Sequence, residues 1–308
     1  MRAPVPMGMI TAAMYQPTQL RTGAPTPFRP SFPAAMLFAG LGMVFESLRA
    51  DDAHYDLFHP KPANELRPLS TDRPDTTESA YTVDAGHFQV ELEAFTWTHD
   101  REAPRTTDVW TGSANLKVGL LDFIDFQAVL TPYVSERVND RAPAEEGTAN
   151  GFGDTDLRMK FNLWGNDGGP TALALMPFVT LPTHDRDLGS GRRVEGGLIA
   201  PFYVEQSERW GFGFMLETDA VENEDEDGYT AEFVITGTIG GEIYGDLGGF
   251  LEFASITRAE SGSEGQAYFN GGLTYALAEY VQLDAGWNLG LTTASDDIRL
   301  FVGLSFKI

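Results

Sequence analysis

Charged side chains recur at every second position in several stretches of this 308-residue sequence. Between Asp154 and Trp164, for example, charged or polar residues alternate with apolar ones. Successive side chains of a β-strand point to opposite faces, so such a stretch predicts a strand with one charged face and one apolar face. Across the chain this pattern places eleven charged residues on one face, namely Glu91, Glu93, Asp156, Arg158, Lys160, Glu195, Glu217, Glu232, Glu252, Asp284 and Arg299.

These eleven residues are candidate lumen-lining or pore-lining groups if the strands close into a barrel with the apolar face outside. Eight carboxylates against three bases would give an interior that attracts cations, because rings of charge bias what passes a pore. The alternative is that mixed charges fill a narrow interior as ion pairs. A barrel of intermediate size is compatible with either arrangement.

A second group of charged residues, Asp72, Arg73, Asp75 and Glu78, precedes the first alternating stretch. One interpretation folds this segment into the lumen as a plug, with Arg73 paired to an inward carboxylate such as Glu91 or Glu232. The alternative is a solvated tether, or a turn fixed by Asp72 and the following proline.

Catalytic and metal-binding patterns are weak. The sequences Thr98-His99-Asp100 and Thr183-His184-Asp185 would lie at strand ends, where a surface hydrolase could place an Asp–His pair. Adjacent strand residues point to opposite faces, which makes each local pair a poor dyad. The chain has no cysteine, and its acidic run at residues 222–227 lacks the spaced ligands of a calcium loop. We therefore expect no enzyme, no cofactor and no metal site.

The elements that must position these residues are twelve alternating stretches, mostly of 10–14 residues, the length that a tilted strand needs to span a membrane. Without helical periods between them, they are expected to pair as an antiparallel meander. Long charged links and short links alternate, as in bacterial outer-membrane barrels with short periplasmic turns. The sequence thus predicts an all-β, twelve-stranded antiparallel transmembrane β-barrel, with strands at about 87–98, 107–120, 124–136, 154–164, 171–182, 194–206, 211–221, 229–240, 247–258, 266–276, 281–290 and 298–307.

Composition divides the chain into three parts. Residues 1–50 form a leader whose apolar run at 33–45 fits a secretory signal peptide. Residues 51–86 are polar and rich in proline, which predicts an irregular periplasmic or plug segment, and residues 87–308 form the barrel. The formal net charge of −24 argues against a nucleic-acid partner.

Several motifs resemble one family. They are STDRPDTTES at residues 70–79, GFGDT at 151–155, NLWG at 162–165, ALMPF at 174–178 with LPT at 181–183, and LTY at 273–275 with QLD at 282–284. Over residues 68–308 the chain resembles the outer-membrane transporter proteins of the meta-pathway of phenol degradation. The resemblance implies a passive channel for small hydrophobic or aromatic compounds in the bacterial outer membrane.

The expected partners are outer-membrane lipid, lipopolysaccharide, small hydrophobic solutes and the barrel-insertion machinery. The last strand resembles the signal that this machinery binds, although Ile308 stands where an aromatic residue usually ends such chains. A closed structural barrel and a surface-facing hydrolase remain alternatives to the channel.

Overall fold

The computed structural model describes residues 55–101, 105–140, 147–189, 191–223 and 227–308, and the expected leader at 1–50 lies outside them. The described residues form antiparallel strands and one short 3₁₀ helix, η2 (Ala63–Glu65). The strands are β1 (Phe88–Asp100), β2 (Arg105–Leu121), β3 (Ile124–Asp140), β4 (Gly147–Gly151), β5 (Thr155–Trp164), β6 (Thr171–Leu181), β7 (Glu195–Glu205), β8 (Trp210–Glu222), β9 (Tyr229–Tyr244), β10 (Leu247–Arg258), β11 (Gln266–Ala278), β12 (Val281–Gly290) and β13 (Ile298–Lys307).

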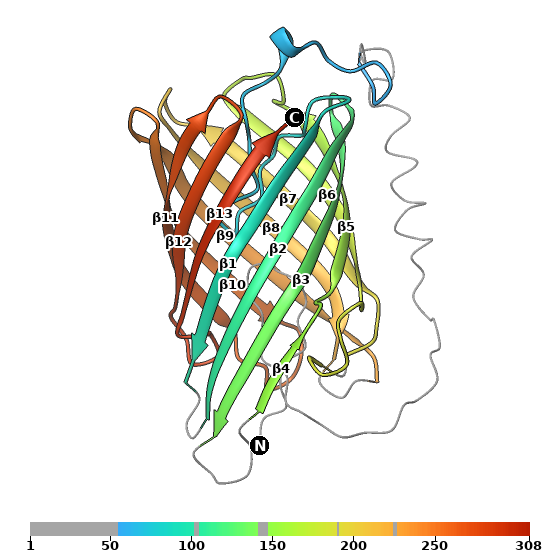
Figure 1. Ribbon diagram of the computed structural model, residues 1–308, viewed down its shortest axis with the longest axis vertical. Coiled ribbons are helices and arrows are strands. Elements are labelled where there is room, and N and C mark those ends of the chain that lie inside the picture. Colours follow the sequence, from blue (N-terminus) through green and yellow to red (C-terminus); the bar gives the residue numbers. More distant parts are fainter. Residues whose placement is uncertain (1–54, 102–104, 141–146, 190, 224–226) are drawn as a thin grey trace.

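The strands close into a barrel (Figure 1). Each strand pairs with its neighbours along the chain, and β1 pairs with both β2 and β13, so the first and last strands join. Both β4 and β5 pair with β3, at different heights, and therefore occupy one position in the wall. The wall thus has twelve strand positions, which confirms the predicted twelve-stranded antiparallel barrel.

The predicted strand at 154–164 corresponds to β5, but the structure adds a segment that was not predicted. This segment, β4, precedes β5 along the chain, and the backbone between the two leaves the β3 ladder. The backbone N–H of Phe152 donates to Asp185 Oδ2 at 2.8 Å, and the Phe152 carbonyl accepts from the N–H of Asp185 at 2.9 Å. The loop before β7 therefore binds this backbone and draws it away from the β3 ladder.

The barrel wall is apolar outside and polar inside. Along β8, Leu216 is 61 % exposed, whereas the neighbouring Glu217 is 3 % exposed. The same alternation leaves large apolar side chains such as Leu251 and Phe253 exposed on β10 while Glu252 between them is buried. A protein that met water outside would reverse this order, whereas lipid favours an apolar exterior. The protein therefore lies in the bacterial outer membrane, with lipid against these side chains.

No helix in the described part of the chain is long and apolar enough to span a membrane.

Two prolines interrupt the backbone ladder at mid-height. Within the described wall, the β5–β6 register passes from Arg158↔Phe178 directly to Phe161↔Leu175, with Pro177 in the gap. The β6–β7 register likewise passes from Leu173↔Phe202 to Met176↔Ile199, with Pro201 in the gap. Proline has no N–H to donate, so the wall at β5–β7 is less strongly paired here than elsewhere. We call these two adjacent gaps the proline seam.

Residues 55–86 lie at the end of the barrel that carries the short turns and the C-terminus, and part of this segment threads inside (Figure 1). At this end of the barrel, Arg67 Nε donates to Asp84 Oδ1 at 2.7 Å and Arg67 Nη2 to the carbonyl of Asp122 at 3.0 Å. The segment is thereby fixed to the turn between β2 and β3.

Candidate functional site

The candidate site is the lumen, and its inner half holds a loop of the chain itself. We call residues 71–84 the inner loop, and the half next to the short turns the inner half. The inner loop bonds to inward side chains of β1, β2, β5, β9, β10, β11 and β12, which surround it. Only a segment inside the barrel can contact strands on all these sides.

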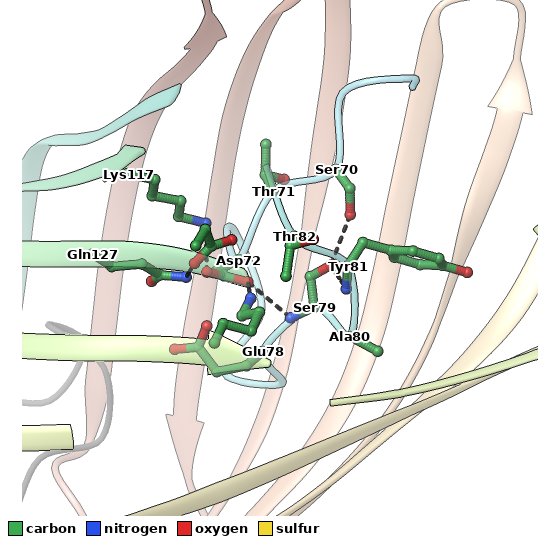
Figure 2. A network of polar contacts seen from close by, with 12 residues as sticks. Ser70, Thr71, Asp72, Glu78, Ser79, Ala80, Tyr81, Thr82, Lys117 and Gln127 are labelled. Atoms are coloured by element: carbon green, nitrogen blue, oxygen red, sulfur yellow. Dashed lines mark hydrogen bonds and ion pairs between the residues drawn. The ribbon is translucent and has the colours of Figure 1, made fainter. Parts of the chain in front are cut away.

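Asp72 is bonded on several sides within the lumen (Figure 2). Its Oδ1 accepts from Lys160 Nζ at 2.5 Å and from the N–H of Ser79 at 3.0 Å, and its Oδ2 contacts Lys117 Nζ. Its own N–H donates to Glu91 Oε2 at 3.1 Å. Burial alone would raise the pKa of Asp72, but the two lysines outweigh it and hold this pKa well below its ordinary value.

Arg73 binds inward carboxylates of β1 and β12. Its Nη1 donates to Glu93 Oε2 at 2.7 Å and its Nη2 to Asp284 Oδ1 at 2.8 Å. The guanidinium also lies 5.5 Å from the ring centroid of Phe301 and packs against Gly303, where any side chain would meet it. The sequence-based pairing of Arg73 with Glu91 or Glu232 is therefore wrong. Glu91 instead binds Lys117, and Glu232 binds Arg258 at 2.6 Å.

The tip of the inner loop is held by Glu252 on β10. Its two carboxylate oxygens accept from the N–H groups of Thr76 and Thr77 at 2.9 and 2.8 Å, and Thr77 Oγ1 donates to it at 2.6 Å. Asn270 Nδ2 donates to the same carboxylate at 2.7 Å. Asp75, beside this tip, interacts with Thr238 and Glu252.

The returning arm of the loop begins at Glu78, whose Oε1 accepts from Arg158 Nη1 at 2.9 Å. Arg158 also contacts Asp156 at 3.3 Å. Further along, the backbone of Asp84 runs directly over Gly119 on β2, where a Cβ would overlap it. The arm thus leaves the barrel along β2, close to where it entered.

All eleven predicted lumen residues are buried, with at most 8 % exposure. Six of them contact the inner loop, namely Glu91, Glu93, Arg158, Lys160, Glu252 and Asp284. Arg299 binds Glu93 at 2.6 Å, and Asp156 binds Arg158. The other three, Glu195, Glu217 and Glu232, lie nearer the long loops, in what we call the outer half. Ion pairs and hydrogen bonds to the inner loop therefore fill the inner half.

Sequence reasoning missed several inward charges in or beside predicted strands, among them Lys117, Asp125, Asp219, Glu222, Arg258 and Lys307. The same alternation could have found them. Lys117 matters most, because it neutralises both Asp72 and Glu91.

At mid-height the lumen carries an apolar surface. Eight inward side chains on β6–β11 form one buried cluster, the luminal apolar cluster: Met176, Phe178, Ile199, Met215, Val234, Ala254, Ile256 and Tyr268. The backbone N–H of Glu78 lies 3.5 Å from Met215 Sδ, so the cluster borders the inner loop. It also lies beside the proline seam, since Met176 immediately precedes Pro177.

The two outer histidines pair across strands or loops. His99 Nδ1 lies 2.8 Å from Asp108 Oδ1 on β2, and His184 Nδ1 lies 2.7 Å from Asp154 Oδ1. The hydrogen bond to Asp154 raises the pKa of His184, and partial burial opposes this rise. Among the described residues, no group of three or more His, Cys, Asp or Glu is arranged to hold a metal ion.

Fold and lumen together define a bacterial outer-membrane β-barrel that holds a segment of its own chain. Residues 71–308 match the family described as "Putative MetA-pathway of phenol degradation", and the chain belongs to this family, as its motifs indicated. No curated protein matches the sequence.

Solved structures share the fold. An outer membrane channel from Pseudomonas putida F1 is similar with a TM-score of 0.56 and 12 % identity, over 80 % of this chain and 99 % of that chain. The CymD monoaromatic hydrocarbon channel has a TM-score of 0.40 and 10 % identity, over 72 % of this chain and 87 % of that chain. At such identities the likeness concerns the fold alone.

Proposed function

We propose that the protein is a passive conduit for small hydrophobic or aromatic compounds across the outer membrane, and that it is not an enzyme. The luminal apolar cluster carries this proposal. It places apolar side chains inside a barrel whose other inward positions are mainly polar or charged. The description of the family, which refers to phenol degradation, supports an aromatic solute.

The physical argument concerns the solute's surroundings. A pore for ions or sugars needs polar groups that replace water, whereas apolar walls favour solutes that water excludes. Removing about 150 Å² of aromatic surface from water contributes about 4 kcal/mol at roughly 25 cal/mol per Å². A surface of this kind at mid-height would hold such a solute briefly between the two ends.

The route from the cluster is the second step of the proposal. An axial path towards the periplasm meets the inner loop and its ion pairs, which would have to part. The proline seam offers a lateral path, because fewer backbone hydrogen bonds hold β6 to its neighbours there. An apolar solute could leave through it into the lipid without crossing the charged half.

The absence of native cysteine allows a direct test. Leu175 and Ala200 face each other at the gap in the β6–β7 register, so L175C/A200C should form a disulfide across the seam. The matched control is L283C/L304C, across the fully paired β12–β13 ladder. Uptake of labelled toluene by cells expressing the protein is measured under oxidising and reducing conditions.

Oxidation should lower uptake in the seam variant, reduction should restore it, and the control should not respond. An equal loss in both variants would contradict the lateral route. Uptake no faster than in cells without the protein would contradict the conduit and favour the closed structural barrel. The surface hydrolase is tested separately, by hydrolytic assays on vesicles that carry H99A or H184A.

The two other expected partners, the barrel-insertion machinery and lipopolysaccharide, would contact the two ends of the barrel. We infer that β13 is the segment that the insertion machinery binds, and that lipopolysaccharide contacts the outer loops. Replacing Ile308 with Phe should speed membrane assembly if this machinery prefers a terminal aromatic residue. Unchanged assembly kinetics would contradict the role given to the last residue.

A further inference from the structure

The outer half of the lumen holds an excess of carboxylates. Five acidic side chains lie there on β7–β9, namely Glu195, Glu217, Asp219, Glu222 and Glu232, and all are buried. Two arginines bind members of this group. Arg258 Nε donates to Glu232 at 2.6 Å, and Arg193 Nε donates to Glu222 at 2.9 Å.

Glu217 and Asp219 differ from the other acids of this group. They are 3 % and 4 % exposed, and apart from a hydrogen bond that the two carboxyls can share with each other, their four oxygens have no donor among the described residues. The two side chains lie close enough to interact with each other, and Asp219 directly faces Glu232 across the β8–β9 ladder. Like charges directly opposite one another on a sheet destabilise it.

The two arginines that attract Glu217 and Asp219 are bound to other carboxylates. Arg258 attracts Asp219 but donates to Glu232. Arg158 attracts Glu217, but its guanidinium binds Glu78 and Asp156. Buried carboxylate oxygens without donors are costly, so a group that brings positive charge and N–H donors would be stabilised here. Glu232 contributes a fifth such oxygen, its Oε1.

The apolar cluster adjoins these carboxylates on the same strands. On β8 the inward positions run Met215, Glu217, Asp219, and on β9 Val234 precedes Glu232 towards the outer end. A molecule that contacts both the luminal apolar cluster and these carboxylates needs an apolar body and a cationic head. The head would lie about two residues along the strand from the cluster, towards the outer end. Hydrogen bonds from an ammonium group to carboxylates are charge-assisted and therefore stronger than hydrogen bonds between neutral groups.

We propose that Glu217 and Asp219 form a binding site for the head group of amphipathic cations, specifically arylalkylamines in their protonated form, whose ring lies on the luminal apolar cluster. This inference rests on the proposed function and narrows its substrate class. It adds to the apolar selection a preference for positive charge at one end of the solute.

The test compares two probes of similar shape, the charged 2-phenylethylammonium and the neutral 2-phenylethanol. Binding to the full chain in a nonionic detergent is followed by isothermal titration calorimetry, with protein-free micelles as the blank. The ammonium should bind about tenfold or more tightly than the alcohol, because its hydrogen bonds are charge-assisted. Ethylammonium, which lacks the ring, should bind much more weakly.

The variant E217Q/D219N keeps the side-chain volumes and should abolish the preference for the ammonium while leaving the alcohol's affinity unchanged. E242Q, near the end of β9 beside the short turns, is the matched control and should keep the preference. Retention of heat-modifiable gel migration shows that each variant is folded.

The two proposals fail differently. Equal affinity of the parent protein for ammonium and alcohol would overturn the cation site and leave the apolar conduit standing. Preference that survives E217Q/D219N would also overturn it. Ethylammonium binding as tightly as 2-phenylethylammonium would overturn the amphipathic class in favour of a simple cation site. Absence of binding by either ring compound would overturn both proposals.

Discussion

Replacing Arg73 with Ala should destabilise the barrel and loosen the inner loop together. Arg73 lies between Glu93 and Asp284, whose side chains are 3 % and 0 % exposed. Removing one partner of a buried ion pair costs about 3–5 kcal/mol, because the other charge stays buried alone. Glu93 keeps Arg299 at 2.6 Å, so the stranded charge is mainly that of Asp284. We therefore expect a loss near 3 kcal/mol in the free energy of unfolding.

The assay is denaturant unfolding of the protein in lipid vesicles, combined with conductance across a planar bilayer. R209A serves as control, because the ion pair of Arg209 with Glu242 lies at an exposed turn and should cost only about 0–1 kcal/mol. Adding D284N to R73A removes the stranded carboxylate and should return about 1–2 kcal/mol. Conductance should rise in R73A, because the loop has lost one of its anchors.

A cost for R73A as small as that for R209A would refute this reasoning. So would a failure of D284N to restore any stability, because the penalty would then come from lost packing on Phe301 and not from the uncompensated charge. Unchanged conductance with a large loss of stability would mean that the remaining contacts hold the inner loop unaided.

Three further predictions follow from the same contacts. Leu251→Arg on the lipid face of β10 should cost about 2–4 kcal/mol in vesicle unfolding, and Tyr244→Arg at the turn about 0–1, so equal costs would contradict the assigned lipid face. Glu252→Gln should speed hydrogen exchange at the tip of the inner loop while exchange in the strands stays slow, and uniform acceleration would contradict its role as a local anchor. Asp154 raises the pKa of His184 in the folded protein. The stability that this pair contributes is therefore fully present below about pH 6.5, the ordinary pKa of histidine, and is lost as the pH rises through the raised pKa of the folded state. Exchange of the loop around His184 should therefore increase from pH 6 to 9 in the parent by more than base catalysis explains, and this excess should be absent in His184→Asn.

The strands and their faces could be predicted from the sequence because side-chain direction alternates with a period of two. The stretches predicted at 247–258, 281–290 and 298–307 coincide with β10, β12 and β13. The split of the strand near residue 154 could not be predicted in this way. It depends on a contact with Asp185 in a loop some thirty residues later, which no local pattern reports.

Which charged residues pair with one another in the lumen was much less predictable than the face of the wall on which each side chain lies. That Arg73 would meet an inward carboxylate follows from charge, but which carboxylate depends on how deeply the loop enters the barrel. That depth is set by backbone contacts such as Thr76 and Thr77 with Glu252. Glu252 was predicted as a lumen charge, and it does face the lumen. Its role in binding the backbone of the inner loop could not be predicted from the sequence.

The charge balance of the lumen changes once the inner loop and Lys117 are included. Counting eight carboxylates against three bases treats the whole interior as one acidic surface, but in the inner half Asp72, Arg73 and Glu78 add their own charges. There, lysines and arginines bind most of the carboxylates, whereas Glu252 accepts hydrogen bonds from the inner loop and Asp75 lies beside it. Among the described residues, the two acids with no donor on either carboxylate oxygen apart from each other's carboxyl, Glu217 and Asp219, lie in the outer half. We therefore expect a preference for cations to arise at these two residues, which a solute from outside meets before it reaches the apolar cluster and the proline seam.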